Sequence, residues 1–197
     1  GKIEDSVSIF PYLEGRYRVV CMDEPGSGFS DKPAMDYNVT SMAEFTLDFA
    51  RRLGIEKMLL AGGSQGGLLT LLCCHLAPER VRKAAVYSAA GMFNRSPVLV
   101  KLFRALPPEA VRIFMRGSSL FWNSPLYPGW LEERARALDF IDNAEQPGFG
   151  MHVFGCLASQ FEMDFPKLYS EIETPTLIFW GSHDFAMPQS QGRKIHS

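Results

Sequence analysis

The chain has 197 residues, of which 46% are hydrophobic and 21% are charged, and its formal net charge at pH 7 is −2. This length suits one domain with a sizeable core, and the composition is typical of a globular protein rather than of a disordered one. Charges of both signs are spread along the sequence, so it offers no basic stripe for nucleic acid and no polybasic arm for a membrane surface. We therefore expect a small-molecule substrate.

The cysteines and the apolar segments bear on the cellular compartment. Cys21, Cys73, Cys74 and Cys156 form no C-x-x-C pair and lie in apolar surroundings, so we expect buried free thiols and a cytoplasmic location. The first residues lack the apolar stretch of a signal peptide. The longest apolar run, residues 68–77, is too short to cross a bilayer, and we expect a soluble protein with no transmembrane segment.

Short apolar runs have the length and composition of buried strands. They cover residues 17–22, 57–61, 83–88 and 176–180. Turn residues stop the first of these strands, and Gly181 stops the last.

Helical patterns separate the predicted strands. Ser41 and Glu44 form a capping box with Ser41 as the N-cap, and Gly54 ends the helix that follows. A second helix is predicted over residues 68–76, before Pro78. Strands that alternate with helices predict an α/β fold, in which flanking helices cover both faces of a mostly parallel sheet.

The alternation stops between about Gly91 and Phe165, where the pattern is helical and rich in aromatic residues. We interpret residues 92–168 as a helical cap inserted into the sheet domain. Residues 1–91 are then the first part of the core, and residues 169–197 are its second, incomplete part.

Residues 62–66 (G-G-S-Q-G) match the G-x-S-x-G pattern between a predicted strand and a predicted helix. Ser64 on such a strained turn projects its hydroxyl from the carboxyl end of the sheet, and Gly62 and Gly66 let strand and helix approach closely. The backbone N–H of Gln65 and the positive end of the helix dipole are placed to stabilise an oxyanion. The pattern predicts that Ser64 is a nucleophile, in an elbow that contains Gly62, Gly63 and Gly66.

A phosphate-binding loop is the alternative interpretation of this glycine-rich turn. A P-loop ends in G-K-[ST], where this chain has Leu68 and Leu69, and a dinucleotide fingerprint has a glycine where Ser64 stands. Both alternatives are disfavoured, and no cofactor or metal is expected.

Three further motifs resemble segments of the α/β-hydrolase family, and they occur in the family's order. Residues 23–33 (D-E-P-G-S-G-F-S-D-K-P) are similar to the D-x-P-G-x-G-x-S segment after the family's fourth strand. Residues 78–81 (P-E-R-V) resemble the turn into its sixth strand, and residues 175–184 resemble its seventh strand with the loop that carries the catalytic acid. The sequence is especially similar to the capped branch, which contains small esterases, lipases, C–C bond hydrolases and haloperoxidase-like enzymes.

The resemblance implies a Ser-His-Asp triad in which Asp184 is the acid, with a turn-forming aspartate as the alternative. A serine nucleophile argues against the haloalkane dehalogenases and the epoxide hydrolases, which attack with a carboxylate. We expect a carboxylesterase- or lipase-like hydrolase that cleaves a carboxylic ester or related acyl substrate with a small hydrophobic acyl or aryl group. C–C bond hydrolysis, aminopeptidase action and cofactor-free peroxidation use the same triad and stay open.

The triad histidine is harder to identify. The candidates are His75, His152, His183 and His196. The first two lie in a predicted helix and in the predicted cap, the third is adjacent to Asp184, and the last follows without the strand that precedes the family's base. The resemblance implies that the base lies beyond Ser197, and that these 197 residues are inactive by themselves.

The family's first strands and its His-Gly motif precede the D-x-P-G segment. Gly1 matches the glycine of that motif, which makes the backbone N–H of Lys2 the second oxyanion donor. The sequence is therefore expected to be truncated at both ends. The alternative from a different class is a pseudohydrolase, which lacks the base and acts as a binding or scaffold protein.

Overall fold

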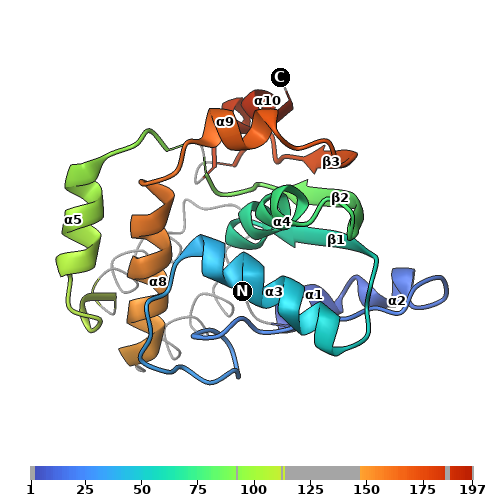
Figure 1. The fold of residues 1–197 in the computed structure, drawn as a ribbon, viewed down its shortest axis with the longest axis horizontal. Coiled ribbons are helices and arrows are strands. Elements are labelled where there is room, and N and C mark those ends of the chain that lie inside the picture. Colours follow the sequence, from blue (N-terminus) through green and yellow to red (C-terminus); the bar gives the residue numbers. More distant parts are fainter. Residues whose placement is uncertain (1–2, 92, 112, 114–146, 185–186, 197) are drawn as a thin grey trace. The chain divides into compact units, whose positions relative to one another are not determined.

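The structure is a computed structural model that describes residues 3–91, 93–111, 113, 147–184 and 187–196 (Figure 1). The chain divides into two compact units. Unit 1 comprises residues 1–37 and 101–157, and unit 2 comprises residues 38–100 and 158–197. Within the predicted cap, residues 92, 112 and 114–146 lie outside the described residues, so the cap stays a prediction.

Unit 2 is built on a parallel sheet of three strands in the order β1-β2-β3 (Figure 1). The strands are β1 (Met58–Gly63), β2 (Val81–Tyr87) and β3 (Thr176–Phe179). All three run in the same direction, so their carboxyl ends meet at one edge of the sheet. This arrangement confirms the predicted α/β fold class.

Helices of unit 2 cover one face of this sheet. Helix α4 (Gln65–Leu76) packs against β1 and β2, and α3 (Val39–Arg52) packs against α4. The short helix α9 (Phe165–Ser170) contacts α4, and α10 (Gln189–His196) contacts β3. The core on this side contains Leu71, Val86 and Ala89, packed against Tyr169, Ile172, Ile178, Trp180 and Ile195.

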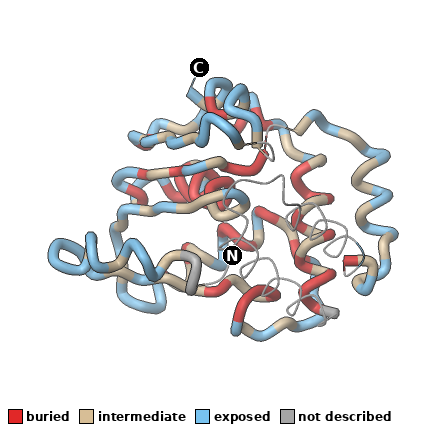
Figure 2. The backbone as a smooth tube through the Cα atoms, turned by 180° about the vertical axis from the view of Figure 1, so that it is seen from behind, coloured by how far each residue is buried: buried red, intermediate tan, exposed pale blue. Residues whose placement is uncertain are grey.

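The other face of the sheet is half exposed. It carries Leu59, Tyr87, Leu177 and Phe179, whose exposed fractions range from 51% to 57%. Figure 2 shows buried stretches beside exposed ones. Partly buried and exposed residues alternate along most of β1 and along β3, whereas β2 also carries buried residues. Among the described residues of unit 2, α4, α9 and α10 all contribute to the core on the opposite face.

Helix α3 begins three residues before the predicted capping box. Asn38 is the N-cap: its backbone is extended, and its side-chain oxygen accepts a hydrogen bond from the Ser41 N–H at 2.8 Å. Ser41 lies inside the first turn, so the prediction that it caps the helix was wrong. The predicted end is confirmed, because Gly54 follows the last turn with a φ of 71°.

Arg80 explains why the P-E-R-V motif matters to unit 2. Its guanidinium donates hydrogen bonds of 2.9 Å to the carbonyl oxygens of Leu47 and Ile55. These carbonyls belong to α3 and to the loop that enters β1. Charge-assisted hydrogen bonds of this kind fix the loop, and with it the start of β1.

Unit 1 contains α1 (Glu4–Val7) and α2 (Phe10–Leu13), while α5 (Pro97–Ala105) and α8 (Pro147–Gln160) each have residues in both units. Residues 17–22 were predicted to form a buried strand, but they are irregular, and Tyr17 and Val20 are 51% and 41% exposed. A strand needs a partner for its backbone N–H and C=O groups, and among the described residues no strand pairs with this segment. The prediction was wrong.

Among the described residues, no helix is long and apolar enough to cross a membrane. All four cysteines are free thiols, and Cys73, Cys74 and Cys156 are buried. Cys21 is only partly buried, so the expectation of buried thiols holds for three of the four cysteines.

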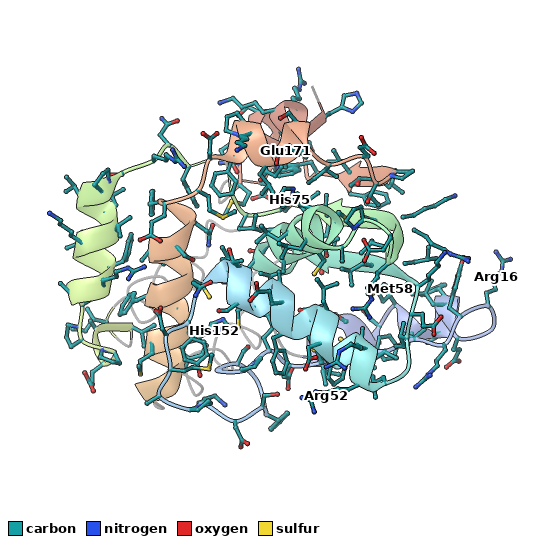
Figure 3. All side chains as sticks on the ribbon, in the orientation of Figure 1. Arg16, Arg52, Met58, His75, His152 and Glu171 are labelled. Carbon is teal, nitrogen blue, oxygen red and sulfur yellow. The ribbon has the colours of Figure 1, made fainter. Side chains whose placement is uncertain are left out.

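His152 forms the centre of a buried polar cluster in unit 1 (Figure 3). Its Nε2 atom lies 3.8 Å from Oε2 of Glu24, and its ring packs edge-on against Tyr37 with the centroids 5.3 Å apart. Burial lowers the pKa of His152 to about 4 despite the nearby carboxylate, so the imidazole is neutral at pH 7.

We expect acid to destabilise the protein through His152. Because folding lowers the pKa of this group from 6.5 to about 4, the unfolded chain binds the extra proton between these two values. The free energy of unfolding should hold its full value above pH 6.5 and fall by about 3 kcal/mol as the pH is lowered to 4. Urea unfolding of the wild type and of His152→Gln over this range measures the effect. The variant should show a shallower dependence on pH, and equal slopes would contradict the assignment.

Candidate active site

Ser64 alone separates a strand from a helix. Strand β1 ends at Gly63 and α4 begins at Gln65, so Ser64 is the N-cap, with φ 51° and ψ −124°. A positive φ is uncommon for a residue other than glycine and costs free energy. Ser64 is also exposed. The predicted strained backbone at a strand-to-helix junction is confirmed.

The start of α4 surrounds the Ser64 backbone with donors. The Ser64 carbonyl accepts hydrogen bonds from the N–H groups of Gly67 and Leu68, at 3.0 and 3.2 Å. Gln65 is the first helical residue, so its backbone N–H lies at the positive end of the helix dipole. This end of a helix favours negative charge, which is what an oxyanion requires.

The glycines of this turn differ in how closely they are packed. A Cβ atom on Gly62 would lie 2.3 Å from the carbonyl oxygen of Gly66, so α4 approaches β1 only because Gly62 has no side chain. A Cβ atom on Gly66 would meet no described atom within 4 Å. The tight contact on the helix side is instead at Gly67, where a Cβ atom would lie 2.8 Å from Cβ of Ala89. Gly67, which directly follows the G-x-S-x-G pattern, was the signal for this contact that the sequence analysis missed.

Asp184 follows β3 and therefore lies after the same edge of the sheet as Ser64. Its Oδ1 atom accepts a hydrogen bond from the Met187 N–H at 2.8 Å, and its own N–H donates to the Gly181 carbonyl at 3.4 Å. The side chain thus stabilises its own turn. A carboxylate accepts several hydrogen bonds, so this contact is compatible with a further donor.

The histidines of unit 2 are engaged elsewhere. His75 lies in α4 with Nδ1 3.5 Å from Oε2 of Glu171 (Figure 3). Nδ1 of His183 lies 3.0 Å from the neighbouring Ser182 hydroxyl. His196 ends α10 and lines a pocket of about 160 Å³ beside β3. Among the described residues of unit 2, no histidine is hydrogen-bonded to either predicted triad residue.

Lys2, the predicted second oxyanion donor, lies outside the described residues. The next residue is held firmly: the Ile3 N–H donates to Oδ1 of Asp23 at 2.8 Å. The other oxygen of this buried carboxylate accepts from the Phe29 N–H, also at 2.8 Å. Asp23 therefore ties the beginning of the chain to the D-x-P-G segment.

The packing difference predicts opposite effects for two alanine substitutions. Gly62→Ala would force apart β1 and α4, and we expect it to destabilise the protein by about 1–3 kcal/mol. Gly66→Ala places the same methyl group in open space on a helix, so its free energy of unfolding should equal or exceed that of the wild type. Denaturant unfolding of the matched pair measures both, and equal losses would refute the assignment of the tight contact to Gly62.

Known proteins resemble this chain over most of its length. A 2-hydroxy-6-oxononadienedioate/2-hydroxy-6-oxononatrienedioate hydrolase of Klebsiella pneumoniae is 28% identical over 203 residues, which cover 96% of this chain and 68% of that protein. A dihydrolipoyllysine-residue acetyltransferase component of the acetoin cleaving system of Pseudomonas putida is 26% identical over 194 residues. That match covers 93% of this chain and 49% of the relative, so the chain spans about half the length of that relative.

Solved structures give the same fold. The 2-hydroxy-6-oxo-6-phenylhexa-2,4-dienoate hydrolase of Rhodococcus sp. strain RHA1 superposes with a TM-score of 0.66 at 26% identity, over 96% of this chain and 71% of that one. A hydrolase of Pseudomonas aeruginosa superposes with a TM-score of 0.77 at 21% identity, over 98% and 72% of the two chains.

The family model described as alpha/beta hydrolase fold matches residues 3–197. This match covers the parallel sheet, the turn at Ser64 and the loop of Asp184 together. The chain therefore belongs to the α/β-hydrolase fold family.

Proposed function

We propose that this protein is a serine hydrolase in which Ser64 is the nucleophile. The observation that supports this most strongly is the φ of 51° at an exposed serine between β1 and α4. Strain of this kind persists only where surrounding contacts enforce it, and it is concentrated at functional sites. Family membership and the hydrolase names of several relatives support the same proposal.

In the proposed reaction, the Ser64 hydroxyl attacks a carbonyl carbon while its proton passes to a histidine. The carbonyl oxygen becomes an oxyanion that accepts hydrogen bonds from the backbone N–H groups of Gln65 and Lys2. The leaving group takes the proton from the imidazolium, and water then releases the acyl group from Ser64. Asp184 orients the imidazole and stabilises its protonated form.

The histidine in this proposal is outside residues 1–197. In unit 2, His75 is beside Glu171 and His183 contacts its own neighbour, while His196 lines the pocket beside β3. None of these contacts prepares an imidazole to accept the proton of Ser64.

The proposed substrate is a carboxylic ester with a small hydrophobic acyl or aryl group. A second candidate comes from the names of two relatives, which are hydrolases of 2-hydroxy-6-oxo-dienoate compounds. Both classes present a carbonyl carbon to the nucleophile, so the same site serves either. A pseudohydrolase that only binds such molecules is the alternative that the experiment separates.

The test uses the full-length protein encoded by the gene that carries this sequence. We expect turnover of p-nitrophenyl butyrate or of 2-hydroxy-6-oxo-6-phenylhexa-2,4-dienoate, and Ser64→Ala should lower kcat by about 10³-fold or more. Asp184→Asn should lower it by about 10²–10⁴-fold, because the imidazole loses its orienting partner. Ser190→Ala, at an exposed serine of α10, is the matched control and should keep full activity.

Covalent labelling separates the alternatives. A fluorophosphonate should modify Ser64, and peptide mass spectrometry of the labelled protein identifies the residue that carries the label. Turnover that survives Ser64→Ala would contradict the nucleophile assignment. A folded protein with neither turnover nor labelling would be a pseudohydrolase.

A further inference from the structure

A second strained serine lies next to the first. Ser88 directly follows β2 and has a φ of 44°. Among the described residues other than glycine, only Ser64 and Ser88 have a positive φ. Strand β2 is the neighbour of β1, and Gly63 is paired with Tyr87, so the two serines lie level at adjacent strand ends.

The residues around Ser88 bind both backbone groups of Ser64. The Ser64 N–H donates to the Tyr87 carbonyl at 3.1 Å, and the Ala90 N–H donates to the Ser64 carbonyl at 2.8 Å. In a regular parallel ladder, these two partners would be two residues apart along β2. Here they are three apart, so one extra residue is accommodated at Ser88. This is the arrangement of a β-bulge whose first residue has a left-handed backbone.

Packing on both sides of Ser64 depends on the same segment. The Tyr87 ring lies over Gly63, where a Cβ atom would come within 1.9 Å of it. Ala89 is fully buried against Gly67. The segment from Tyr87 to Ala90 thus contacts the nucleophile turn at three places: the Ser64 backbone, the end of β1 and the start of α4.

The Ala90 hydrogen bond also bears on the oxyanion donor. The Ser64 carbonyl and the Gln65 N–H belong to one planar peptide group, and no cis peptide bond is present among the described residues. In a trans peptide, the N–H points opposite to the carbonyl. Fixing the Ser64 carbonyl toward Ala90 therefore fixes the direction in which the Gln65 N–H points.

We propose that Ser88 is a positioning residue for the nucleophile and for its oxyanion donor. Its left-handed backbone, rather than its hydroxyl, shifts the ladder so that Ala90 reaches the Ser64 carbonyl. The inference rests on the proposed nucleophilic role of Ser64. It adds that the active geometry is held from β2 as well as from α4.

The test is a series of substitutions at Ser88 in the full-length enzyme. The substituting residues differ in how readily they adopt a left-handed backbone. Ser88→Gly and Ser88→Asn adopt this conformation readily, and we expect their kcat to stay close to the wild-type value. Ser88→Val cannot do so without strain, and its kcat should fall about ten- to a hundred-fold while KM changes little. Lys83→Val places the same side chain on an exposed position near the start of β2 and should leave kcat unchanged.

A transition-state analogue gives a second readout that a purely structural role would not move. The affinity of a trifluoromethyl ketone inhibitor, which forms an oxyanion on the serine, should fall in Ser88→Val in step with kcat. If Ser88→Val does not fold, Ser88→Ala should show the same split between kcat and KM to a smaller degree.

Two outcomes would overturn the inference. One is a folded Ser88→Val variant whose kcat equals that of the wild type. The other is a loss of kcat in Ser88→Gly as large as that in Ser88→Val, which would assign the effect to the hydroxyl. Both differ from the failure of the proposed function, in which Ser64→Ala itself retains turnover.

Discussion

The turn from β1 into α4 over the single residue Ser64 is the constraint on which the rest of unit 2 depends. A chain that changes from extended to helical backbone in one step needs an unusual dihedral angle there, and the strand and the helix then lie almost in contact. The absence of a side chain at Gly62 makes that contact possible. The energetic cost of the turn is offset by α4, whose apolar residues form the centre of the core with β2 and β3.

Hydrogen bonds from two elements oppose relaxation of this turn. The first turn of α4 donates hydrogen bonds to the Ser64 carbonyl, and the segment after β2 binds both the N–H and the carbonyl of Ser64. A donor whose direction is set before the substrate arrives requires no reorganisation when charge develops. The strain at Ser64 is therefore matched by contacts that a relaxed turn would lose.

Much of the fold was predictable because its signals are local. The strand, glycine and serine pattern around Ser64 specified both the junction and its backbone, and Gly54 specified the end of α3. The start of α3 was not specified locally, since Asn38 and Ser41 are both good caps. A buried contact decides between them: the Val39 N–H donates to the Ser159 hydroxyl at 3.0 Å, across 120 residues of sequence. Residues 17–22 show the same limit, because β propensity forms no strand without a partner.

Ser88 illustrates why part of the candidate site escapes sequence reasoning altogether. Serine has no marked preference for a left-handed backbone, so nothing at this position suggests a bulge. The conformation follows from demands on its neighbours: Tyr87 completes the ladder with Ser64, Ser88 itself donates to the Phe179 carbonyl of β3, and Ala90 must reach the Ser64 carbonyl. With Tyr87 and Ala90 fixed in this way, Ser88 accommodates the extra residue by adopting a left-handed backbone. The strained backbone of Ser88 thus results from the sheet and the nucleophile turn together. The sequence of neither one alone indicates it.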